Sequence, residues 1–189
     1  IVIQKKIDKN YNCAQENCQM NNLNAKKNFN IPNHFVTKYC FYNEDLGYLL
    51  ANGTVGVCFN DHSRMVMDPN EDFIQYYKNY NSNEEVINLN DDLEDNSKII
   101  RLQSKITILK KFAKNFKKIK FLYFIEEDYY ESCIPLYHVK YFVKKNDAIL
   151  FKMNDKNIQV NFYDHQKMII FWNTRKMCLV KDFNKKCNL

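Results

Sequence analysis

Apolar and polar residues alternate over short stretches of this chain, which is the pattern of β-strands with one buried face. Two stretches do so in nearly the same way: VGVCFNDHSRMVM (residues 55–67) is answered by IQVNFYDHQKMII (residues 158–170). In each, a strand is followed by Asp-His, one further residue, a basic residue and a second apolar strand. Repetition over this distance predicts two copies of one small structural unit.

The repeat continues upstream with a slip of one residue. Residues Val36, Lys38 and Tyr39 are echoed by the later set Val139, Lys140 and Tyr141. The first copy is then expected to be an antiparallel meander, with an Asn-Gly hairpin turn at residues 51–54. Its expected strands are residues 35–42, 47–50, 55–59, 65–67, 73–77 and 86–89.

A helix is expected after the acidic stretch that ends near Ser97, which is a plausible N-cap. Apolar residues then recur every three or four positions, as on one helix face; they are Ile106, Leu109, Phe112, Phe116 and Ile119. Lysines fill the other faces; they are Lys110, Lys111, Lys114, Lys117 and Lys118. A Lys-rich helix over residues 105–120 could bind nucleic acid, acidic lipid or calmodulin. The commoner outcome is that such a helix buries its apolar stripe and solvates its lysines.

The second copy is expected to form strands at residues 137–143, 148–153, 157–163, 167–171 and 176–181, without a closing helix. The polar residues 1–32 are expected to be a flexible leader, with one short helix at residues 14–23. This divides the chain into the leader, a first unit at 33–120, a connector at 121–134 and a C-terminally truncated second unit at 135–189. Because the chain starts at Ile1, we expect it to be a piece of a longer protein.

Charge and cysteine content narrow the classes of function. The net charge of +6 favours an acidic partner, and frequent charges exclude a transmembrane helix. The seven cysteines are odd in number and unpatterned, which indicates reduced thiols in the cytoplasm or nucleus and argues against zinc. Neither nucleotide-binding glycine motifs nor kinase or hydrolase motifs occur. We therefore expect no catalytic residues, no metal site and no cofactor.

Four segments resemble the polo box, and their tandem arrangement resembles the C-terminal domain of polo-like Ser/Thr kinases. VTKY followed by LGYLLANGTVGVCFNDHSR is similar to the family's VTKW, LGYQL and SVGVLFND-x-[ST]-R; KITILKKF is similar to KITLLKYF; IQVNFYDHQKMII is similar to VQ[IV]NFF-DHTK-LI. The resemblance covers residues 33–189. It implies an α+β fold of two polo boxes, each a six-stranded antiparallel sheet with a packed helix, the second box lacking its helix in this chain.

The resemblance also implies a function and a site. A peptide phosphorylated on Ser or Thr would lie in a groove between the boxes, with His165 and Lys167 holding the phosphate. Tyr39 falls where the family has a groove Trp, and a groove Leu falls near Lys120 or Phe121. The module would dock a kinase, with its catalytic domain upstream of Ile1, onto phosphorylated proteins at centrosomes, spindle and kinetochores in mitosis. The expected partners are Ser/Thr-phosphorylated proteins and the kinase's own catalytic domain; nucleic acid and membrane are not expected.

The chemistry suits a phosphate, which needs convergent charged donors. His165 and Lys167 are two residues apart, so an extended backbone would place both on one face. On residues alone, an Asp-His-x-Lys turn is more often solvated. The family does not use the first copy of this turn for phosphate, so His62 and Arg64 are expected to be surface residues. The alternative function is a structural polo-box unit that assembles or dimerises without phosphate.

Overall fold

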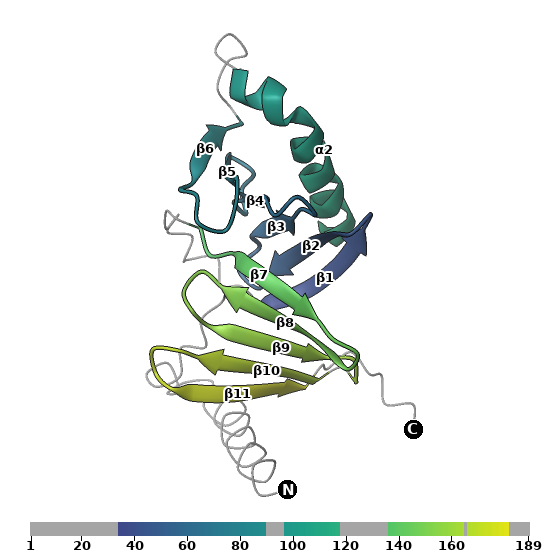
Figure 1. Cartoon of the computed structure of the whole chain (residues 1–189), viewed down its shortest axis with the longest axis vertical. Coiled ribbons are helices and arrows are strands. Elements are labelled where there is room, and N and C mark those ends of the chain that lie inside the picture. Colours follow the sequence, from purple (N-terminus) through teal and green to yellow (C-terminus); the bar gives the residue numbers. More distant parts are fainter. Residues whose placement is uncertain (1–33, 90–96, 118–135, 165, 182–189) are drawn as a thin grey trace, which may run out of the picture. The chain divides into compact units, whose positions relative to one another are not determined.

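The computed structural model describes residues 34–89, 97–117, 136–164 and 166–181. It divides the chain into two compact units, one running from Asn33 to Tyr141 and one that begins at Phe142. The helix expected at residues 14–23 and the connector at 121–134 lie outside the described residues. Each unit is built around one β-sheet (Figure 1).

The first sheet has six strands that follow one another in chain order, and every neighbouring pair is antiparallel. They are β1 (Val36–Tyr42), β2 (Asp45–Leu50), β3 (Val55–Cys58), β4 (Arg64–Met67), β5 (Phe73–Tyr77) and β6 (Glu85–Asn88). The alternating pattern therefore predicted all six strands, to within two residues at each end.

The turn between β2 and β3 also follows the prediction. Gly53 adopts a φ of +89°, a conformation that glycine adopts without a steric penalty. The side chain of Asn52 accepts a hydrogen bond from the backbone N–H of Thr54 at 3.1 Å, and Leu50 N–H donates to the Thr54 carbonyl at 2.9 Å. The Asn-Gly pair thus closes the hairpin and sets the register of the two strands.

Helix α2 (Ser97–Lys117) lies across one face of the first sheet (Figure 1). Four members of the expected apolar stripe, Ile106, Leu109, Phe112 and Phe116, are buried, and the fifth, Ile119, lies outside the described residues. Leu102 and Ala113 of the same helix are buried as well. These side chains share one core with sheet residues such as Val57, Met65 and Ile74. The predicted helix is confirmed for residues 97–117, and its apolar side chains are packed against the sheet.

The opposite face of the first sheet is also buried. Leu46, Tyr48 and Leu50 alternate with residues of the helix face, and each is at most 1% exposed. Strands β3 and β4 are buried at every position. A strand in the middle of this sheet therefore has two buried faces. A polar side chain on such a strand needs a hydrogen-bond partner inside the protein.

The second sheet has five strands in chain order, with β8 to β11 paired antiparallel. They are β7 (Val139–Lys144), β8 (Ala148–Met153), β9 (Ile158–Phe162), β10 (Gln166–Phe171) and β11 (Lys176–Lys181). The sequence pattern predicted these five, whereas the resemblance implied six. Burial alternates strictly along β8 and β9, so this sheet has one buried face within the described residues.

The repeat is a repeat of structure as well as of sequence. Cys58 pairs with Arg64 across β3 and β4, and their counterparts 103 residues further on, Asn161 and Lys167, pair across β9 and β10. The one-residue slip upstream has a physical cause, because β1 carries a register shift between Val36 and Lys38. A β-bulge inserts one extra residue into a strand without disturbing the rest of the sheet.

Candidate functional site

The two Asp-His-x-basic segments are the turns that join β3 to β4 and β9 to β10. In the first turn, the Asp61 carboxylate accepts bonds from the Ser63 backbone N–H at 3.0 Å and the Ser63 hydroxyl at 2.6 Å. In the second, the Asp164 carboxylate accepts bonds from Gln166 N–H at 3.0 Å and from the Gln166 side-chain amide at 3.1 Å. Each Asp therefore caps its own turn through the backbone N–H two residues on.

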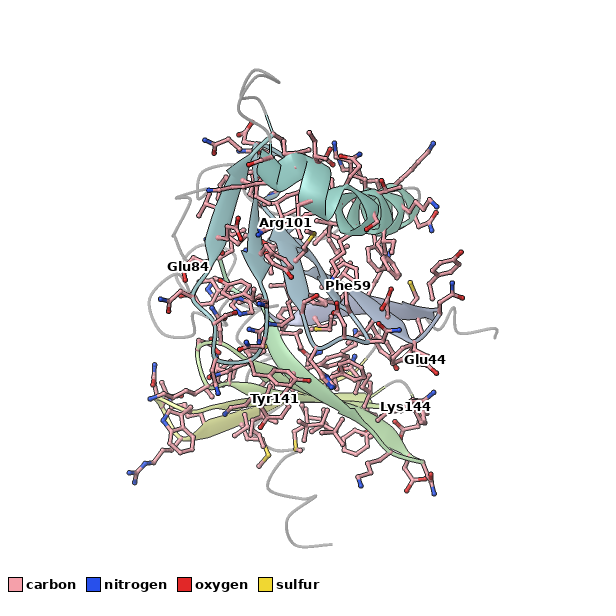
Figure 2. The ribbon with its side chains drawn as sticks, turned by 45° about the horizontal axis from the view of Figure 1, so that its top comes forward. Glu44, Phe59, Glu84, Arg101, Tyr141 and Lys144 are labelled. Atoms are coloured by element: carbon pink, nitrogen blue, oxygen red, sulfur yellow. The ribbon has the colours of Figure 1, made fainter. Side chains whose placement is uncertain are left out.

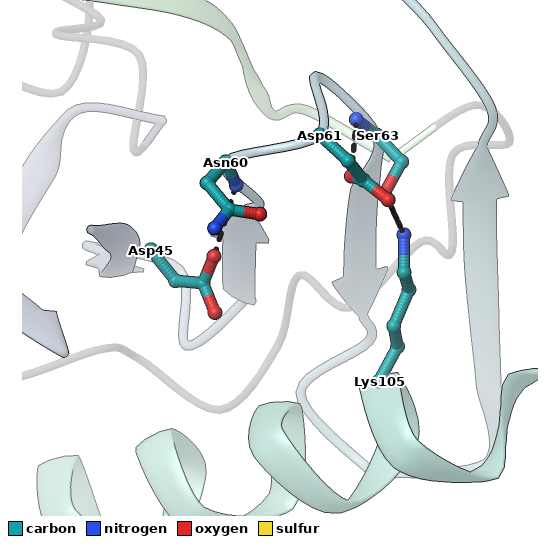
Figure 3. Close-up of polar contacts among 5 residues, drawn as sticks. All are labelled: Asp45, Asn60, Asp61, Ser63 and Lys105. Atoms are coloured by element: carbon teal, nitrogen blue, oxygen red, sulfur yellow. Dashed lines mark hydrogen bonds and ion pairs between the residues drawn. The ribbon is translucent and has the colours of Figure 1, made fainter. Parts of the chain in front are cut away.

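The first turn is additionally tied to the helix (Figure 3). The ammonium of Lys105 on α2 forms an ion pair with Asp61 and donates to the Ser63 hydroxyl. Partial burial raises the pKa of Asp61, but the hydrogen bonds from Lys105 and Ser63 outweigh it and hold the pKa below its ordinary value. Next to it, Asn60 N–H donates to the Asp45 carboxylate at 2.9 Å. The loop is therefore a fixed part of the first unit.

Arg64 corrects one of the sequence-based expectations, since it is not a surface residue. Its side chain is 2% exposed, and only His62 of the pair is exposed. One guanidinium nitrogen donates to the carbonyl of Lys140 at 2.5 Å and the other to the carbonyl of Asn79 at 3.1 Å. The guanidinium carbon lies 5.0 Å from the ring centre of Tyr77. The reason is the two-residue period of the strand, which turns position 64 toward the sheet face opposite α2.

Other polar side chains on that face hold the same extended segment, residues 136–140. The Gln75 side-chain oxygen accepts from Leu136 N–H at 2.9 Å, and the Tyr48 hydroxyl accepts from Val139 N–H at 3.1 Å. A Cβ on Gly56 would stand 2.1 Å from the Tyr48 hydroxyl, so glycine is needed there for this tyrosine to fit. Side chains of the first sheet therefore satisfy the backbone N–H groups of Leu136 and Val139 and the carbonyl of Lys140.

His138 is buried inside this contact. It is 4% exposed, its ring lies 4.6 Å from that of Tyr77, and its Nδ1 is 2.9 Å from the carbonyl of Leu136. Burial lowers the pKa of His138 to about 4, and the nearby charge of Arg64 acts in the same direction. The imidazole is therefore neutral near pH 7 and serves as a hydrogen-bonding core residue.

Lys167 occupies the matching position in the second unit. It is 8% exposed and lies on the buried face of the sheet, where Ile169 is 3% exposed. Its neighbour across the strands is Asn161, whose side-chain oxygen accepts from the Gln159 amide at 2.6 Å. Together with Lys167 these two amides form a polar strip on a face otherwise made of residues such as Phe151. Buried cations and amides on an apolar face usually either hydrogen-bond within the core or belong to a binding site.

Tyr39 lies on β1, directly opposite Tyr48 on β2. Because opposed residues share a face, Tyr39 belongs to the sheet face away from α2. It is half-buried, and its ring stands edge-on to Phe41 with centres 6.3 Å apart. The other three candidate site residues, Lys120, Phe121 and His165, lie outside the described residues.

The hydrogen bonds between polar side chains of the first sheet and segment 136–140 were not predicted from the sequence. The available signal was polarity at a core position, because Gln75 stands in an alternating apolar strand and is fully buried. In a strand with two buried faces, such a residue needs a fixed hydrogen-bond partner. Its oxygen has two, Leu136 N–H and the Tyr77 hydroxyl at 3.2 Å.

Within the described residues, no three or more His, Cys, Asp or Glu side chains gather as metal ligands would. The three cysteines there, Cys40, Cys58 and Cys178, are in the reduced thiol form. Burial raises the pKa of Cys58 to about 12, which makes this thiol unreactive. No helix in the same part of the chain is long and apolar enough to span a bilayer.

The family model for the polo box duplicated region matches residues 44–106 and 145–188, together more than half of the chain. This chain belongs to the polo-box family. The first matched segment of the polo-box chain includes β2 to β6 of the first sheet, and the second includes β8 to β11 of the second sheet.

Relatives of the polo-box chain are protein kinases by name. The probable serine/threonine-protein kinase CCRP1 of Zea mays is 32% identical over 141 residues, which are 72% of this chain and 22% of that protein. Serine/threonine-protein kinase PLK1 of Xenopus tropicalis is 30% identical over 145 residues, 74% of this chain and 23% of that protein. The chain thus spans less than a quarter of these relatives.

Solved structures share the fold. The polo-box domain of Cdc5 from budding yeast has a TM-score of 0.56 at 17% identity, covering 92% of this chain and 74% of that one. The same yeast domain in complex with a Spc72 phosphopeptide has a TM-score of 0.60 at 18% identity, covering 82% and 61%. The α+β architecture expected from the sequence is confirmed, with the second sheet five-stranded in the described residues.

Proposed function

We propose that this polo-box chain is a phosphoserine- or phosphothreonine-peptide-binding module. The observation that supports this most directly is Lys167, a nearly buried cation in the Asp-His-x-Lys turn region of the second unit. A phosphate carries up to two negative charges and three acceptor oxygens, and a lysine ammonium near the start of β10 can donate to it. The yeast polo-box domain that shares the fold has been crystallised with a phosphopeptide.

In this proposal His165 and Lys167 hold the phosphate together. Lysine contributes a mobile ammonium, and a protonated histidine contributes a directional N–H. The Asp164 cap, with its two bonds to Gln166, fixes the start of β10 and so restricts where the Lys167 backbone can lie. Tyr39 contributes an aromatic surface for the residue before the phosphorylated one, and Lys120 and Phe121 border it.

The parent protein is proposed to be a Ser/Thr kinase with its catalytic domain outside these residues. The module would dock that kinase onto phosphorylated partners in mitosis, at centrosomes, spindle or kinetochores, and would restrain the catalytic domain when empty. In cells, a fluorescent fusion of the wild-type chain should mark these structures and the His165→Ala/Lys167→Met double variant should not. Equal localisation of both proteins would contradict phosphate-directed docking.

The direct test is calorimetry with a Ser-phosphoThr-Pro peptide and its unphosphorylated twin. Only the phosphopeptide should bind, and the His165→Ala/Lys167→Met variant should weaken binding by more than about 100-fold, which abolishes measurable binding, since the two charge-assisted hydrogen bonds contribute roughly 1.5–3 kcal/mol each. Lys145→Met is the matched control, because Lys145 is an exposed lysine of the same unit. Equal affinity for both peptides would instead favour the phosphate-independent assembly function.

Tyr39 has its own test, a peptide array that varies the residue before the phosphorylated one. Tyr39→Ala should weaken all phosphopeptides by about 1–3 kcal/mol, the range for losing a partly desolvated aromatic contact. Tyr39→Trp should sharpen the preference for Ser, because the larger indole offers more contact area. Unchanged profiles for Tyr39→Ala would assign Tyr39 to the core.

A further inference from the structure

Helix α2 concentrates the positive charge of the chain. Its 21 residues contain seven lysines and arginines and no acidic residue. The rest of the chain has 21 basic and 22 acidic residues, because the totals are 28 and 22. The net charge of +6 is therefore a property of this one helix. Figure 2 shows side chains of α2 reaching away from the sheet on its outer side.

Three of these cations are neutralised by carboxylates of the sheet. Arg101 pairs with Glu85 at 2.8 Å, and Lys105 and Lys117 form ion pairs with Asp61 and Glu71. These three pairs tie the flanks of the helix to the loops and strands beneath it. They leave the outer surface of the helix with positive charge alone.

Four of the seven cations remain, of which Lys98 lies apart in the first turn of the helix. The other three, Lys110, Lys111 and Lys114, form a cluster that we call the lysine face. All three are exposed, and no ion pair found within the described residues includes them. Lys110 and Lys114 are four residues apart and Lys111 and Lys114 three apart, so they are neighbours that repel one another. Only Lys114 lies in the last turn, where the helix dipole favours cations. The helix dipole therefore does not account for Lys110 and Lys111.

We propose that the lysine face docks an extended, Asp/Glu-rich segment of a protein partner. From Lys110 to Lys114 the helix rises about 6 Å, close to the ~6.6 Å between alternate side chains of an extended peptide. Carboxylates at every second position of such a peptide would meet successive ammonium groups. This surface lies on the helix side of the first sheet, whereas Tyr39 lies on the other side.

The same observations disfavour other partners. Calmodulin and membrane surfaces take up the apolar face of a helix, and in α2 that face is buried against the sheet. Nucleic-acid sites combine phosphate contacts with arginine forks or stacked aromatic rings. The lysine face has neither, because Arg101 is bound to Glu85 and the aromatic residues Phe112 and Phe116 are buried.

The test uses the full 189-residue chain and a labelled peptide of alternating Glu and Ser, with a Gln-Ser peptide as the neutral twin. Fluorescence anisotropy should detect only the Glu-Ser peptide. Lys110→Gln/Lys111→Gln/Lys114→Gln should raise its dissociation constant about tenfold, the sum of three exposed charge contacts. Gln keeps a helix propensity close to that of Lys, so the helix is retained.

A charge-matched variant, Lys78→Gln/Lys145→Gln/Lys156→Gln, removes three exposed lysines elsewhere and should change the constant less than about twofold. An equal loss in this variant would overturn the proposal in favour of diffuse charge. Tighter binding of duplex DNA or phosphatidylserine vesicles at the same salt would overturn it as well. His165→Ala/Lys167→Met should bind the Glu-Ser peptide normally; a loss there would place the peptide at the proposed phosphate site instead.

Discussion

The hairpins that contain Arg64 and Lys167 have nearly the same sequence, but their basic side chains contact different groups. Both cations sit opposite the same position of the preceding strand, Cys58 in one and Asn161 in the other. The Arg64 guanidinium donates hydrogen bonds to two backbone carbonyls of its own unit. Lys167 lies in a strip with two amide side chains. Local sequence therefore decides where a cation is placed, and the residues packed around it decide its use.

The choice between arginine and lysine fits these two environments. A guanidinium is flat, has five N–H donors and stacks on aromatic rings, so it can bridge two carbonyls while lying over Tyr77. An ammonium is a compact, mobile point charge with three donors, which suits a phosphate whose oxygens approach from several directions. Exchanging the two residues should thus harm both sites.

The largest expected effect is on folding stability in Arg64→Met. The change removes a buried guanidinium with its two partly buried hydrogen bonds to the carbonyls of Lys140 and Asn79, and should lower the free energy of unfolding by about 3–4 kcal/mol. Urea unfolding of the full chain measures this. Arg64→Lys should recover only part of the loss, because an ammonium cannot span both carbonyls. An unchanged midpoint in Arg64→Met would return Arg64 to the surface role first expected for it.

The next largest expected effect is a dependence of folding stability on pH, which arises from His138 in the first unit. The pKa of His138 is lowered to about 4 in the folded chain, so the unfolded chain binds more protons between its ordinary value of 6.5 and 4. Stability from this residue is present above pH 6.5 and is lost as the pH falls toward 4, by about 2–3 kcal/mol. Urea midpoints across this range measure the slope.

His138→Asn is the matched variant for that slope, since the Asn amide can replace the Nδ1–H donor to the Leu136 carbonyl without titrating. The variant should lose stability at neutral pH and show a flatter dependence on acidification. A slope as steep as in the wild type would assign the acid sensitivity to other groups.

Asp61→Ala and Asp164→Ala compare the two turn caps. Both lose the bonds to the residue two positions on, but only Asp61 also holds Lys105 of the helix. We expect a loss of about 1 kcal/mol for Asp61→Ala and about half of that for Asp164→Ala, because both sites are partly exposed. Thermal unfolding of the two variants gives the order, and the reverse order would show that the helix contact adds nothing.

The smallest expected effect on stability is that of Lys167→Met. Replacing a buried cation by an apolar side chain of similar length is often neutral, so the unfolding free energy should change by less than about 0.5 kcal/mol. The same substitution should weaken phosphopeptide binding in calorimetry by about 10- to 100-fold, because it removes one of the two proposed phosphate contacts. A large loss of stability would mean that Lys167, like Arg64, is committed to the fold.

Much of the molecule was predictable from local pattern. The two-residue period marked the strands of both sheets, the Asn52-Gly53 pair marked the turn between β2 and β3, and the three-to-four-residue period marked the buried stripe of α2. These features depend on neighbours along the chain, where periodicity and φ preferences act directly. Even the slip between the copies was visible in the sequence before the bulge in β1 explained it.

What the sequence by itself determined is therefore the repeat, the strands and the identity of the polar turns. Only the tertiary structure decided that Arg64 is buried and that Tyr48 and Gln75 hold the backbone near Val139 and Leu136. It also decided that, among the residues the structure describes, carboxylates pair with the flanks of the helix and not with the lysine face. These outcomes join residues 15 to 91 positions apart. A cation beside a turn has the same local conformation whether solvent, a carbonyl or a ligand meets its charge, and that choice is made by whichever group the fold brings within hydrogen-bonding distance.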